Sequence, residues 1–500
     1  MSTIVFATQS GPRQSRWRVQ SPSVLVLVLL ALPGVVQAQF TLATNNGTIS
    51  IIHSSCVSGA VTIPDTINGL PVTSIGSSAF LWCSSMTSVT IPDSVTNIGA
   101  FAFEECINLT SVTIGNGVSS TGDDAFIGCS SLTSVTMGTN VTSIGDSAFA
   151  GCGSLTSFTI PSSVTNIGSM AFSWCDSLTS ITIPDSVTSI GDEVFWECSS
   201  LSSATIPRSV ISIGACPFAL CTSLIAIPVS SSNPAYISVA GVLFNRSQTT
   251  LIEYPAGKPG TAYTIPDSVT SIGDSAFLYC TNLTNVIIPN SVIIIGDHAF
   301  DTCLGLTSVV IPDSVTSIGN SAFEGCWPLT NVRICNGVTS IGDSAFWDCE
   351  SLTSLTIPSS VTNIGNSAFV YCFDLTSVFF TGNAPTANDL FNLDHGGDDV
   401  TVYYLPGTTG WGATFGGRPT ALWVLPYPQI LTTAPDFGVH SNQFGFRISW
   451  ATNVPVVVEA SANLGTWLPV STNTLTNGWS YFSDPAWTNY SARFYRIRSP

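Results

Sequence analysis

Twelve cysteines of this chain recur with a single period, and that period limits the possible folds more than any other feature. Each follows the previous one by 23 residues, apart from one interval of 59 residues, which equals one period plus 36 residues. An Ile-Gly pair keeps the same spacing, for example at Ile144-Gly145 and Ile167-Gly168. Internal repeats of this length predict a solenoid. The cysteines are Cys83, Cys106, Cys129, Cys152, Cys175, Cys198, Cys221, Cys280, Cys303, Cys326, Cys349 and Cys372.

One repeat contains two extended segments and a turn. In the copy that begins at Leu178, residues 180–183 read Ser-Ile-Thr-Ile, an alternation typical of a half-buried strand. A second extended segment covers residues 187–190, after which Gly191 turns the chain. In many copies an Asp or Asn, such as Asp146, then precedes Ser-Ala-Phe, which predicts a helix N-cap and a short helical turn.

Neighbouring coils must stack, because a single coil cannot bury its own apolar side chains. Strands of adjacent coils would lie about 4.8 Å apart, so about a dozen coils give a rod on the order of 60 Å long. Aspartates at the cap positions of adjacent coils would repel one another, and neutral Ser169, Asn320 and Asn366 interrupt that row. We therefore expect a mainly β solenoid with short helical turns.

The unit L-x-x-V-x-I-P-x-x-V-x-x-I-G-x-x-A-F-x-x-C resembles the BspA-type bacterial leucine-rich repeat over about residues 60–380. The insertion is similar to the hairpin-bearing variant repeat of that family, with Asn233-Pro234-Ala235-Tyr236, Gly241-Val242-Leu243-Phe244 and Leu251-Ile252-Glu253-Tyr254-Pro255. The resemblance implies a curved solenoid that is exported and that binds proteins or mediates adhesion. It implies no catalytic residues.

The chain is expected to divide into five parts. Arg13, Arg16 and Arg18, the apolar run 24–32 and Val36-Gln37-Ala38 are typical of a cleaved export signal, with an uncleaved anchor as the alternative. No later stretch is apolar for long enough to cross a membrane. The expected parts are a signal peptide (1–38), an N-terminal cap (39–74), a leucine-rich repeat solenoid (75–382, variant insertion at about 225–262), a C-terminal cap (383–425) and a small β-sandwich-like domain (426–500).

The last of these parts combines alternating strands with a cluster of arginines. Arg447, Arg493, Arg496 and Arg498 are four of the nine basic residues that remain once residues 1–38 are removed. A basic module on an acidic rod could dock on the rod or attach to the cell envelope. A plain terminal β-domain is the alternative.

Charge excludes two classes of partner. The chain has 12 basic and 30 acidic residues, a net charge of −18, and its only lysine is Lys258. Nucleic-acid binding requires basic groups that displace counterions from phosphates, so a nucleic-acid partner is not expected. Anionic membrane surfaces are disfavoured for the same reason.

The cysteine ladder is the first place where chemistry would be sought. Zinc sites need ligands that converge on a point, whereas each coil here offers one cysteine along a line. A ladder of buried thiols is therefore favoured, with disulfides between neighbours as the alternative. Cys56, Cys216 and Cys335 lie outside the 23-residue spacing, and Cys216 could reach Cys221 in its own coil.

Signals of catalysis and of metal binding are weak. The four histidines, His53, His298, His395 and His440, are scattered and match no nucleophile or zinc-protease motif. The acidic loop at 389–399 could hold calcium, although its spacing does not match an EF-hand and a solvated loop is the favoured interpretation. We expect no enzyme, no cofactor and no metal site.

The expected binding surface follows from alternation along the first strand of each coil, on the side that we expect to be concave. Outward-facing hydroxyls dominate before the insertion, whereas apolar, basic and aromatic residues replace them after it. Exposed apolar residues side by side suggest a partner, and neutral drift is the alternative. The residues are Thr113, Thr136, Thr159, Thr182, Thr205, Ile287, Val310, Arg333, Thr356 and Phe379.

These features predict a secreted or cell-surface scaffold, exported by a bacterial pathway, that binds an extracellular protein or glycan. The alternative is a structural component of the cell envelope or extracellular matrix that is attached through residues 426–500.

Overall fold

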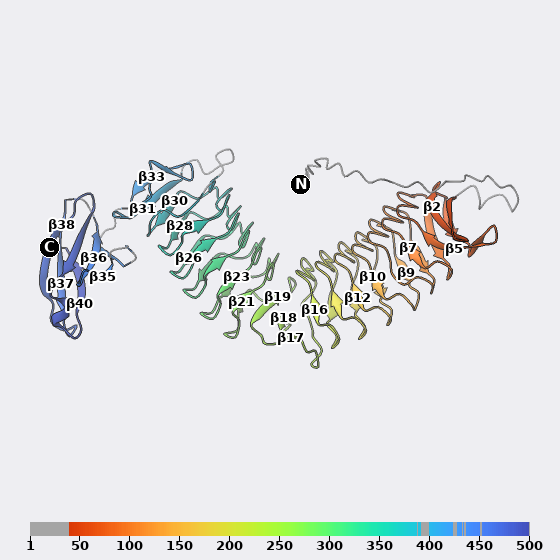
Figure 1. The fold of residues 1–500 in the computed structure, drawn as a ribbon, viewed down its shortest axis with the longest axis horizontal. Helices are drawn as coiled ribbons and strands as arrows, with labels where there is room; N and C mark the ends of the chain where they lie inside the picture. Colours follow the sequence, from red (N-terminus) through yellow and green to blue (C-terminus); the bar gives the residue numbers. More distant parts are fainter. Residues whose placement is uncertain are drawn as a thin grey trace.

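The computed structural model describes residues 40–387, 389–391, 400–423, 428–432, 434, 437–450 and 453–499. Two arms of stacked coils meet at the insertion and form an arch, with the N-terminal cap at one end and the C-terminal sheets at the other (Figure 1). The prediction of a mainly β solenoid is confirmed. Residues 1–38, the expected signal peptide, lie outside the described residues. No helix in the described part of the chain is long and apolar enough to cross a membrane.

Each coil contributes one strand to a first set of parallel sheets, in which equivalent residues pair at the repeat distance. Ile181, for example, pairs with Phe158 of the coil before it. These strands are β3 (Gly59–Thr62), β6 (Met86–Ile91), β8 (Ser111–Ile114), β9 (Ser134–Thr136), β11 (Ser157–Thr159), β13 (Ser180–Thr182) and β15 (Ser203–Thr205) in the N-terminal arm, and β20 (Ala262–Thr264), β22 (Asn285–Ile287), β24 (Ser308–Ile311), β26 (Asn331–Ile334), β28 (Ser354–Ile357) and β30 (Ser377–Phe380) in the C-terminal arm.

The second extended segment of most coils forms a two-residue strand that contains the Ile of the Ile-Gly pair. Ile144 pairs with Ile167, and the same register continues along each arm. These strands are β7 (Asn97–Ile98), β10 (Ser143–Ile144), β12 (Asn166–Ile167), β14 (Ser189–Ile190), β16 (Ser212–Ile213), β21 (Ser271–Ile272), β23 (Ile294–Ile295), β25 (Ser317–Ile318), β27 (Ser340–Ile341) and β29 (Asn363–Ile364).

The core is a column of identical side chains that lie on top of one another. Phe103 and Phe126 stack with ring centroids 5.0 Å apart and planes 2° apart, and Phe300 and Phe323 stack in the same way at 5.1 Å and 4°. Parallel, in-register strands place equivalent side chains in adjacent coils at one strand spacing, which suits stacked rings. Burial of this continuous column is what a single coil could not achieve.

The segment after the Ile-Gly pair forms hydrogen-bonded turns instead of an α-helix. In one coil Ala148 N donates to Gly145 O and Ala150 N donates to Ser147 O, which are single i-to-i+3 bonds. Ser147 (φ 50°) and Gly151 (φ 72°) are left-handed, and most coils repeat this pair of left-handed residues, so a helix cannot continue. The helical part of the expected fold is therefore minor.

The Asp and Asn row caps the neighbouring coil and not a helix of its own coil. The Asp123 carboxylate accepts a hydrogen bond from Asp146 N at 3.0 Å, and the Asp146 carboxylate accepts one from Ser169 N at 2.7 Å. Each negative charge thus meets a backbone donor of the next coil, which offsets the repulsion expected along the row. The residues expected to be helix N-caps do accept backbone hydrogen bonds, but the N–H groups that donate belong to the next coil.

The insertion forms a hairpin that divides the core into two clusters. The strands are β17 (Tyr236–Val239), β18 (Val242–Asn245) and β19 (Thr250–Glu253). β18 pairs antiparallel with both β17 and β19, and β19 pairs parallel with β21 of the next coil. Buried side chains from Ile49 to Ile227 belong to the first cluster, together with Leu243, whereas Val242 and Phe244 begin the second. The arch therefore has a joint at this hairpin (Figure 1).

A buried carboxyl group lies at the joint. In the preceding coil Phe195 N donates to the backbone carbonyl of Pro217, but Phe218 N donates to both carboxyl oxygens of Glu253 at 3.2 Å. Glu253 occupies the position that Ala holds in most other coils, and its side chain replaces a backbone acceptor there. Its pKa is raised to about 8 because burial penalises the charged form.

Both ends of the rod are closed by additional strands. At the N-terminal end β1 (Phe40–Asn45) and β2 (Thr48–Ser54) form a hairpin that turns at Asn46-Gly47, followed by β4 (Thr66–Ile67) and β5 (Leu70–Ile75). At the other end β31 (Thr401–Tyr404) and β33 (Arg418–Leu422) extend the first sheet of the C-terminal arm, and β32 (Thr414–Phe415) pairs with β33. The exact domain boundaries stay a prediction.

Two small sheets follow the C-terminal cap and enclose their own core, which includes Phe446, Ile448 and Val458. They touch the cap, since Arg447 Nη1 donates to Gly407 O at 2.6 Å. Their elements are β34 (Gln429–Leu431), β35 (Gly438–His440), β36 (Gln443–Ser449), β37 (Pro455–Ser461), β38 (Leu468–Thr474), β39 (Trp479–Asp484), the 3-10 helix η1 (Trp487–Asn489) and β40 (Phe494–Arg498).

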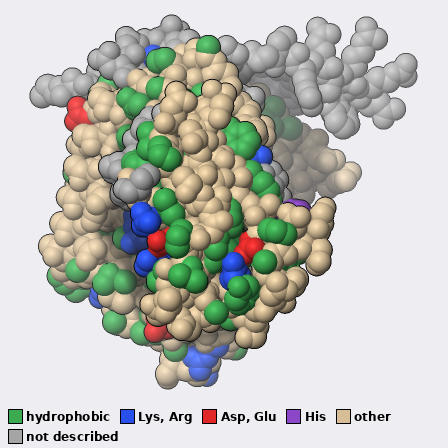
Figure 2. Space-filling view, turned by 90° about the vertical axis from the view of Figure 1, so that its left-hand side faces the viewer, with side chains coloured by type: hydrophobic (Ala, Val, Ile, Leu, Met, Phe, Trp, Pro, Cys, Tyr) green, Lys and Arg blue, Asp and Glu red, His purple; other side chains and the backbone are tan. Residues whose placement is uncertain are grey.

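The arginines of these sheets are largely paired within the sheets. Arg496 and Arg498 both bind the Glu459 carboxylate, at 2.7 and 2.8 Å, and Arg493 binds Asp484 at 2.6 Å. Figure 2, which faces this end of the molecule, shows basic side chains beside acidic ones on a mostly neutral surface. This pairing, with the Arg447 contact, favours docking on the rod over attachment through an unpaired basic patch.

Replacing Gly168 by alanine is expected to destabilise the coil stack. A Cβ at Gly168 would approach the backbone nitrogen of Asp146 in the preceding coil to 2.6 Å, so the coils would have to separate. We expect the free energy of unfolding in urea to fall by about 1–3 kcal/mol. Gly153→Ala is the matched control, because the nearest atom to its Cβ would lie 3.9 Å away. Equal unfolding midpoints for the two variants would contradict this packing.

Glu253→Gln is expected to remove part of the pH dependence of stability. The folded state keeps the Glu253 proton up to a pH of about 8, whereas an unfolded glutamate loses it near pH 4.5. The contribution of Glu253 to the free energy of unfolding should therefore be largest below pH 4.5, and it should be lost as the pH rises to about 8. Urea unfolding at several pH values should show a shallower decline for the variant than for the native chain. Parallel curves would show that Glu253 is not the buried acid.

Candidate functional site

The structure places the predicted surface residues in two separate rows. Thr113, Thr136, Thr159, Thr182 and Thr205 lie in the N-terminal arm, and each is exposed. Ile287, Val310, Arg333, Thr356 and Phe379 lie in the C-terminal arm, where Phe379 is half-buried and the others are exposed. The first sheet is interrupted at the insertion, so the ten residues do not share one continuous sheet.

The threonine row is broken once more within its own arm. Thr113 pairs with Thr136, and Thr159 pairs with Thr182, but β9 and β11 belong to different sheets. A shallow hollow of about 360 Å³ lies there, lined by Thr136, Met137, Thr159 and Pro161 among others. The row presents methyl and hydroxyl groups and no charge, so by itself it offers a partner little specificity.

The C-terminal row combines exposed apolar side chains with a cation. Ile287 and Val310 are 52% and 51% exposed, although their strands bury Val286 and Val309 on the opposite face. Val310 pairs directly with Arg333, and Arg333 pairs with Thr356. Alternation along a strand allows any polar residue at these positions, so the apolar side chains are not required by the core. In the part of the chain that is described, Arg333 has no ion-pair partner.

The row ends in an aromatic cluster at the C-terminal cap. The Phe379 ring stacks on Tyr403 with centroids 5.0 Å apart, and the Trp423 ring lies at a tilt to it with centroids 4.7 Å apart. These contacts explain why Phe379 is only half exposed. Tyr403 and Trp423 extend the row beyond the residues that alternation identified, because β31 and β33 continue the sheet past the last coil.

The in-phase cysteines form a ladder of buried thiols, as favoured from the sequence, with one exception at the first rung. Each thiol donates to the carbonyl of the aromatic residue 26 positions earlier, as Cys175 Sγ does to Phe149 O at 3.3 Å and Cys303 Sγ does to Phe277 O at 3.1 Å. Burial raises the pKa of the ladder thiols from Cys152 to Cys372, for Cys198 to about 12. Neutral, buried thiols are poor nucleophiles and poor metal ligands.

One disulfide joins the N-terminal cap to the first rung of the ladder. It connects Cys56, outside the 23-residue spacing, with Cys83. The suggested pairing of Cys216 with Cys221 is wrong, since both thiols are free. Cys221 Sγ points to Phe195 O inside the core, whereas the Cys216 thiol interacts with Ser275, which lies beyond the insertion. Thirteen cysteines are free, and Cys335 alone among them is half-exposed.

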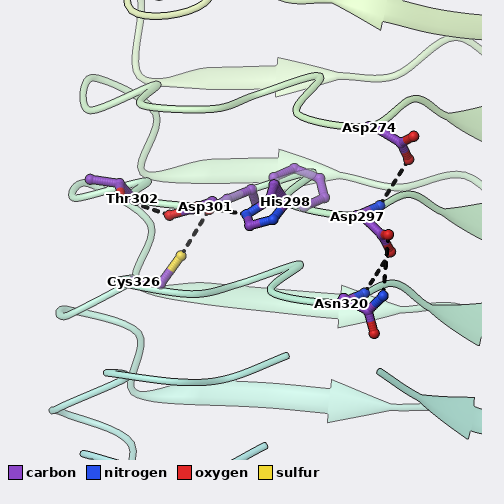
Figure 3. A network of polar contacts seen from close by, with 8 residues as sticks. Asp274, Asp297, His298, Asp301, Thr302, Asn320 and Cys326 are labelled. Atoms are coloured by element: carbon purple, nitrogen blue, oxygen red, sulfur yellow. Dashed lines mark hydrogen bonds and ion pairs between the residues drawn. The ribbon is translucent and has the colours of Figure 1, made fainter. Parts of the chain in front are cut away.

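A cluster that the sequence did not reveal lies on the turn side of the C-terminal arm. Donor atoms of His298, Asp301 and Glu324 all lie within 4.8 Å of one another. Figure 3 shows His298 and Asp301 pointing toward each other, beside the row formed by Asp274, Asp297 and Asn320. No motif marks it, because Glu324 comes from the next coil. The clue available in the sequence is that Asp301 and Glu324 are one period apart.

The possible calcium loop cannot be placed, because Asp389 is the only one of its acidic residues within the described part of the chain. Asp394, His395, Asp398 and Asp399 lie outside the described residues.

Comparisons with known proteins agree with the repeat architecture. Residues 51–176, 142–260 and 256–376 match the model of the BspA type leucine-rich repeat region. A leucine-rich cell surface protein of Faecalibacterium prausnitzii is 35% identical, with a TM-score of 0.62, and the alignment covers 69% of this chain and 94% of that protein. A leucine-rich repeat protein of Eubacterium ventriosum is 25% identical over 78% of this chain and 95% of that protein, with a TM-score of 0.52. No curated protein matches the chain in sequence.

Thiol titration tests the ladder and the disulfide together. Before reduction, the urea-denatured chain should give 13 reactive thiols, and after reduction it should give 15. In the folded protein we expect one fast-reacting thiol, that of Cys335, because the others are buried. Fifteen thiols without reduction would remove the cap disulfide, and 11 or fewer would indicate disulfides within the ladder.

Proposed function

We propose a function that follows from the family of this chain, which belongs to the BspA-type leucine-rich repeat proteins. In this proposal the chain is an exported scaffold, and it binds an extracellular protein through the first sheet of its C-terminal arm. Export is part of the proposal, and it is supported by likeness to a protein described as a cell surface protein. A glycan is the alternative ligand on the same surface.

One observation carries this assignment: the exposed apolar pair Ile287 and Val310 lies beside Arg333 on a rigid sheet. In the N-terminal arm threonines occupy the equivalent positions, so the same backbone tolerates a fully polar face. Exposed apolar side chains grouped beside an arginine are typical of the centre of a protein interface, where water is excluded on binding. The strands beneath are held by adjacent coils, so little conformational entropy is lost when a partner binds.

The proposal includes no catalytic step. The ten predicted surface residues contain no histidine, cysteine or acid, and therefore no nucleophile with its base and no pair of carboxyl groups. Leucine-rich repeat proteins are the known relatives of this chain, and an interaction surface is what such a scaffold offers.

A second candidate function is that of an attached structural component, and one feature of the C-terminal sheets favours it. Strand β38 lies at the edge of its sheet, where β37 is its one paired neighbour among the described strands, and it exposes Leu468 and Val470. An open edge with apolar side chains can accept a strand of another protein. In this function the rod would extend from the attachment point and its C-terminal row would carry no special affinity.

Changing the C-terminal row to the residue that the other arm uses tests the proposed surface. In the variant Ile287→Thr, Val310→Thr and Arg333→Thr, each new side chain suits an exposed strand position. We expect binding to an array of extracellular-matrix proteins to fall by more than about tenfold, since truncating central interface residues often costs 2 kcal/mol or more. Thermal unfolding should be nearly unchanged, because all three side chains are exposed.

The matched control replaces Thr136, Thr159 and Thr182 by serine, at equivalent positions of the other arm. It should bind as the native chain does. Equal affinity for the native chain and the C-terminal variant would refute the surface assignment. Loss in both variants would show that the ligand spans the whole arch. A glycan array probed in parallel distinguishes the two classes of ligand.

A further inference from the structure

We propose that His298, Asp301 and Glu324 form a binding site for one divalent transition-metal ion of the zinc type. Their donor atoms, an imidazole nitrogen and one oxygen of each carboxylate, lie within 4.8 Å of one another. Imidazole together with carboxylate is a donor set that suits zinc and its neighbours in the periodic table. The inference is independent of the proposed partner-binding surface.

Backbone hydrogen bonds between two coils hold the three residues in place. His298 N donates to Asn320 O at 2.8 Å, and Thr302 N donates to Glu324 O at 2.7 Å. Within the first coil Asp301 N donates to His298 O at 3.1 Å. Both His298 and Thr302 are in the left-handed conformation, with φ of 53°, which fixes the direction of the turn between them. The donors are thus arranged by the stack of coils and need little reorganisation to bind an ion.

Side-chain contacts orient two of the donors further. Asp301 Oδ2 lies 2.9 Å from His298 Nδ1, and Asp301 Oδ1 accepts a hydrogen bond from the Thr302 hydroxyl at 2.7 Å (Figure 3). A hydroxyl that donates to a carboxylate in this way orients it for binding a metal ion. An ion would replace the proton that His298 Nδ1 and Asp301 now share, or bind at Nε2 after a ring rotation.

Charge balance favours a cation over a simple His–Asp ion pair. Two carboxylates share one imidazole here, and Asp297 and Asp348 add negative charge nearby. Within the described residues neither Asp301 nor Glu324 forms an ion pair with an arginine or lysine. Burial, with a smaller contribution from Asp301, raises the pKa of Glu324, and the single imidazole of His298 can balance at most one of the two carboxylates. A divalent ion would neutralise both carboxylates at once.

The other coils show that the repeat does not require these residues. Three positions of the repeat define the cluster. His298 is the first left-handed residue of its turn, Asp301 follows the core Phe of the same coil, and Glu324 follows the core Phe of the next coil. In one coil of the N-terminal arm Ser147, Ala150 and Ser173 occupy these positions, and these side chains offer no comparable ligand set. The buried Phe and Cys positions recur between these coils whereas the three cluster positions vary, so the donor set is a local addition to the repeat.

Bound metal would clamp one coil to the next. His298 and Asp301 belong to one coil and Glu324 to its neighbour, so the ion would resist separation of the stack at this point. Because the unfolded chain does not hold the three donors together, binding would stabilise the folded form. Three protein ligands leave at least one position for water.

Calorimetric titration of the full chain with zinc chloride at pH 7.5 tests the site. All proteins carry Cys335→Ser, so that the half-exposed thiol does not compete. We expect one saturable site whose affinity falls by more than about tenfold in Glu324→Gln and in His298→Asn, since even outer partners of metal ligands contribute 10- to 100-fold. Asparagine tolerates the left-handed conformation at position 298, so folding should be retained.

Two control variants separate this site from other acidic groups. Glu104→Gln changes an equivalent acid of the N-terminal arm whose pKa is also raised by burial, and His395→Asn changes the loop histidine. Both should bind zinc as the parent does, and zinc should raise the unfolding temperature of the parent but not of Glu324→Gln. Absence of saturable binding, or equal binding in His298→Asn, would reduce the cluster to an ordinary His–Asp pair. Loss confined to His395→Asn would move the site to the loop.

Discussion

The in-register contact between consecutive coils is the interaction on which the rest of the structure depends. Every coil satisfies part of its backbone through the next one, as Phe149 N does through Ala171 O, and places its aromatic ring on the equivalent ring of the neighbour. Three further ladders use the same register: the thiol-to-carbonyl bonds, the Asp and Asn caps, and the hydroxyls of residues such as Thr165 and Thr188 that donate to the coil before. A residue in the repeat therefore stabilises the fold mainly through its contact with the equivalent residues of the adjacent coils.

The insertion shows what happens when that register is lost. The hairpin β17–β18 separates two coils, the core splits into two clusters, and the parallel first sheet ends on either side. Glu253 restores one link by offering a carboxyl group to Phe218 N, where most other coils offer a backbone carbonyl. The two arms differ on their outward faces, with threonines on one side of the joint and Ile287, Val310 and Arg333 on the other. The joint thus divides both the core and the candidate binding surface.

The repeat length, the β-rich coil and the outward-facing residues could be read from the sequence, because period and alternation are properties of single positions. Other features depend on pairs of residues in different coils. Asp146 has the signature of a helix N-cap, yet its acceptor faces Ser169 N of the next coil. The partner of Cys56 is Cys83, and spacing alone could not distinguish that pairing from others. His298, Asp301 and Glu324 meet only once coils stack, so no linear motif describes them. The aromatic end of the surface row at Tyr403 depends on a cap that departs from the repeat.

Small-angle X-ray scattering of the purified chain measures most directly whether the coils stack into one elongated solenoid. A compact globule of 500 residues would have a radius of gyration of about 23 Å. Stacked coils that form an arch require a value well above that, with a distance distribution that has a long tail. A radius of gyration near 23 Å with a symmetric distribution would contradict the stacking of consecutive coils, and with it the surface and the metal site that depend on it.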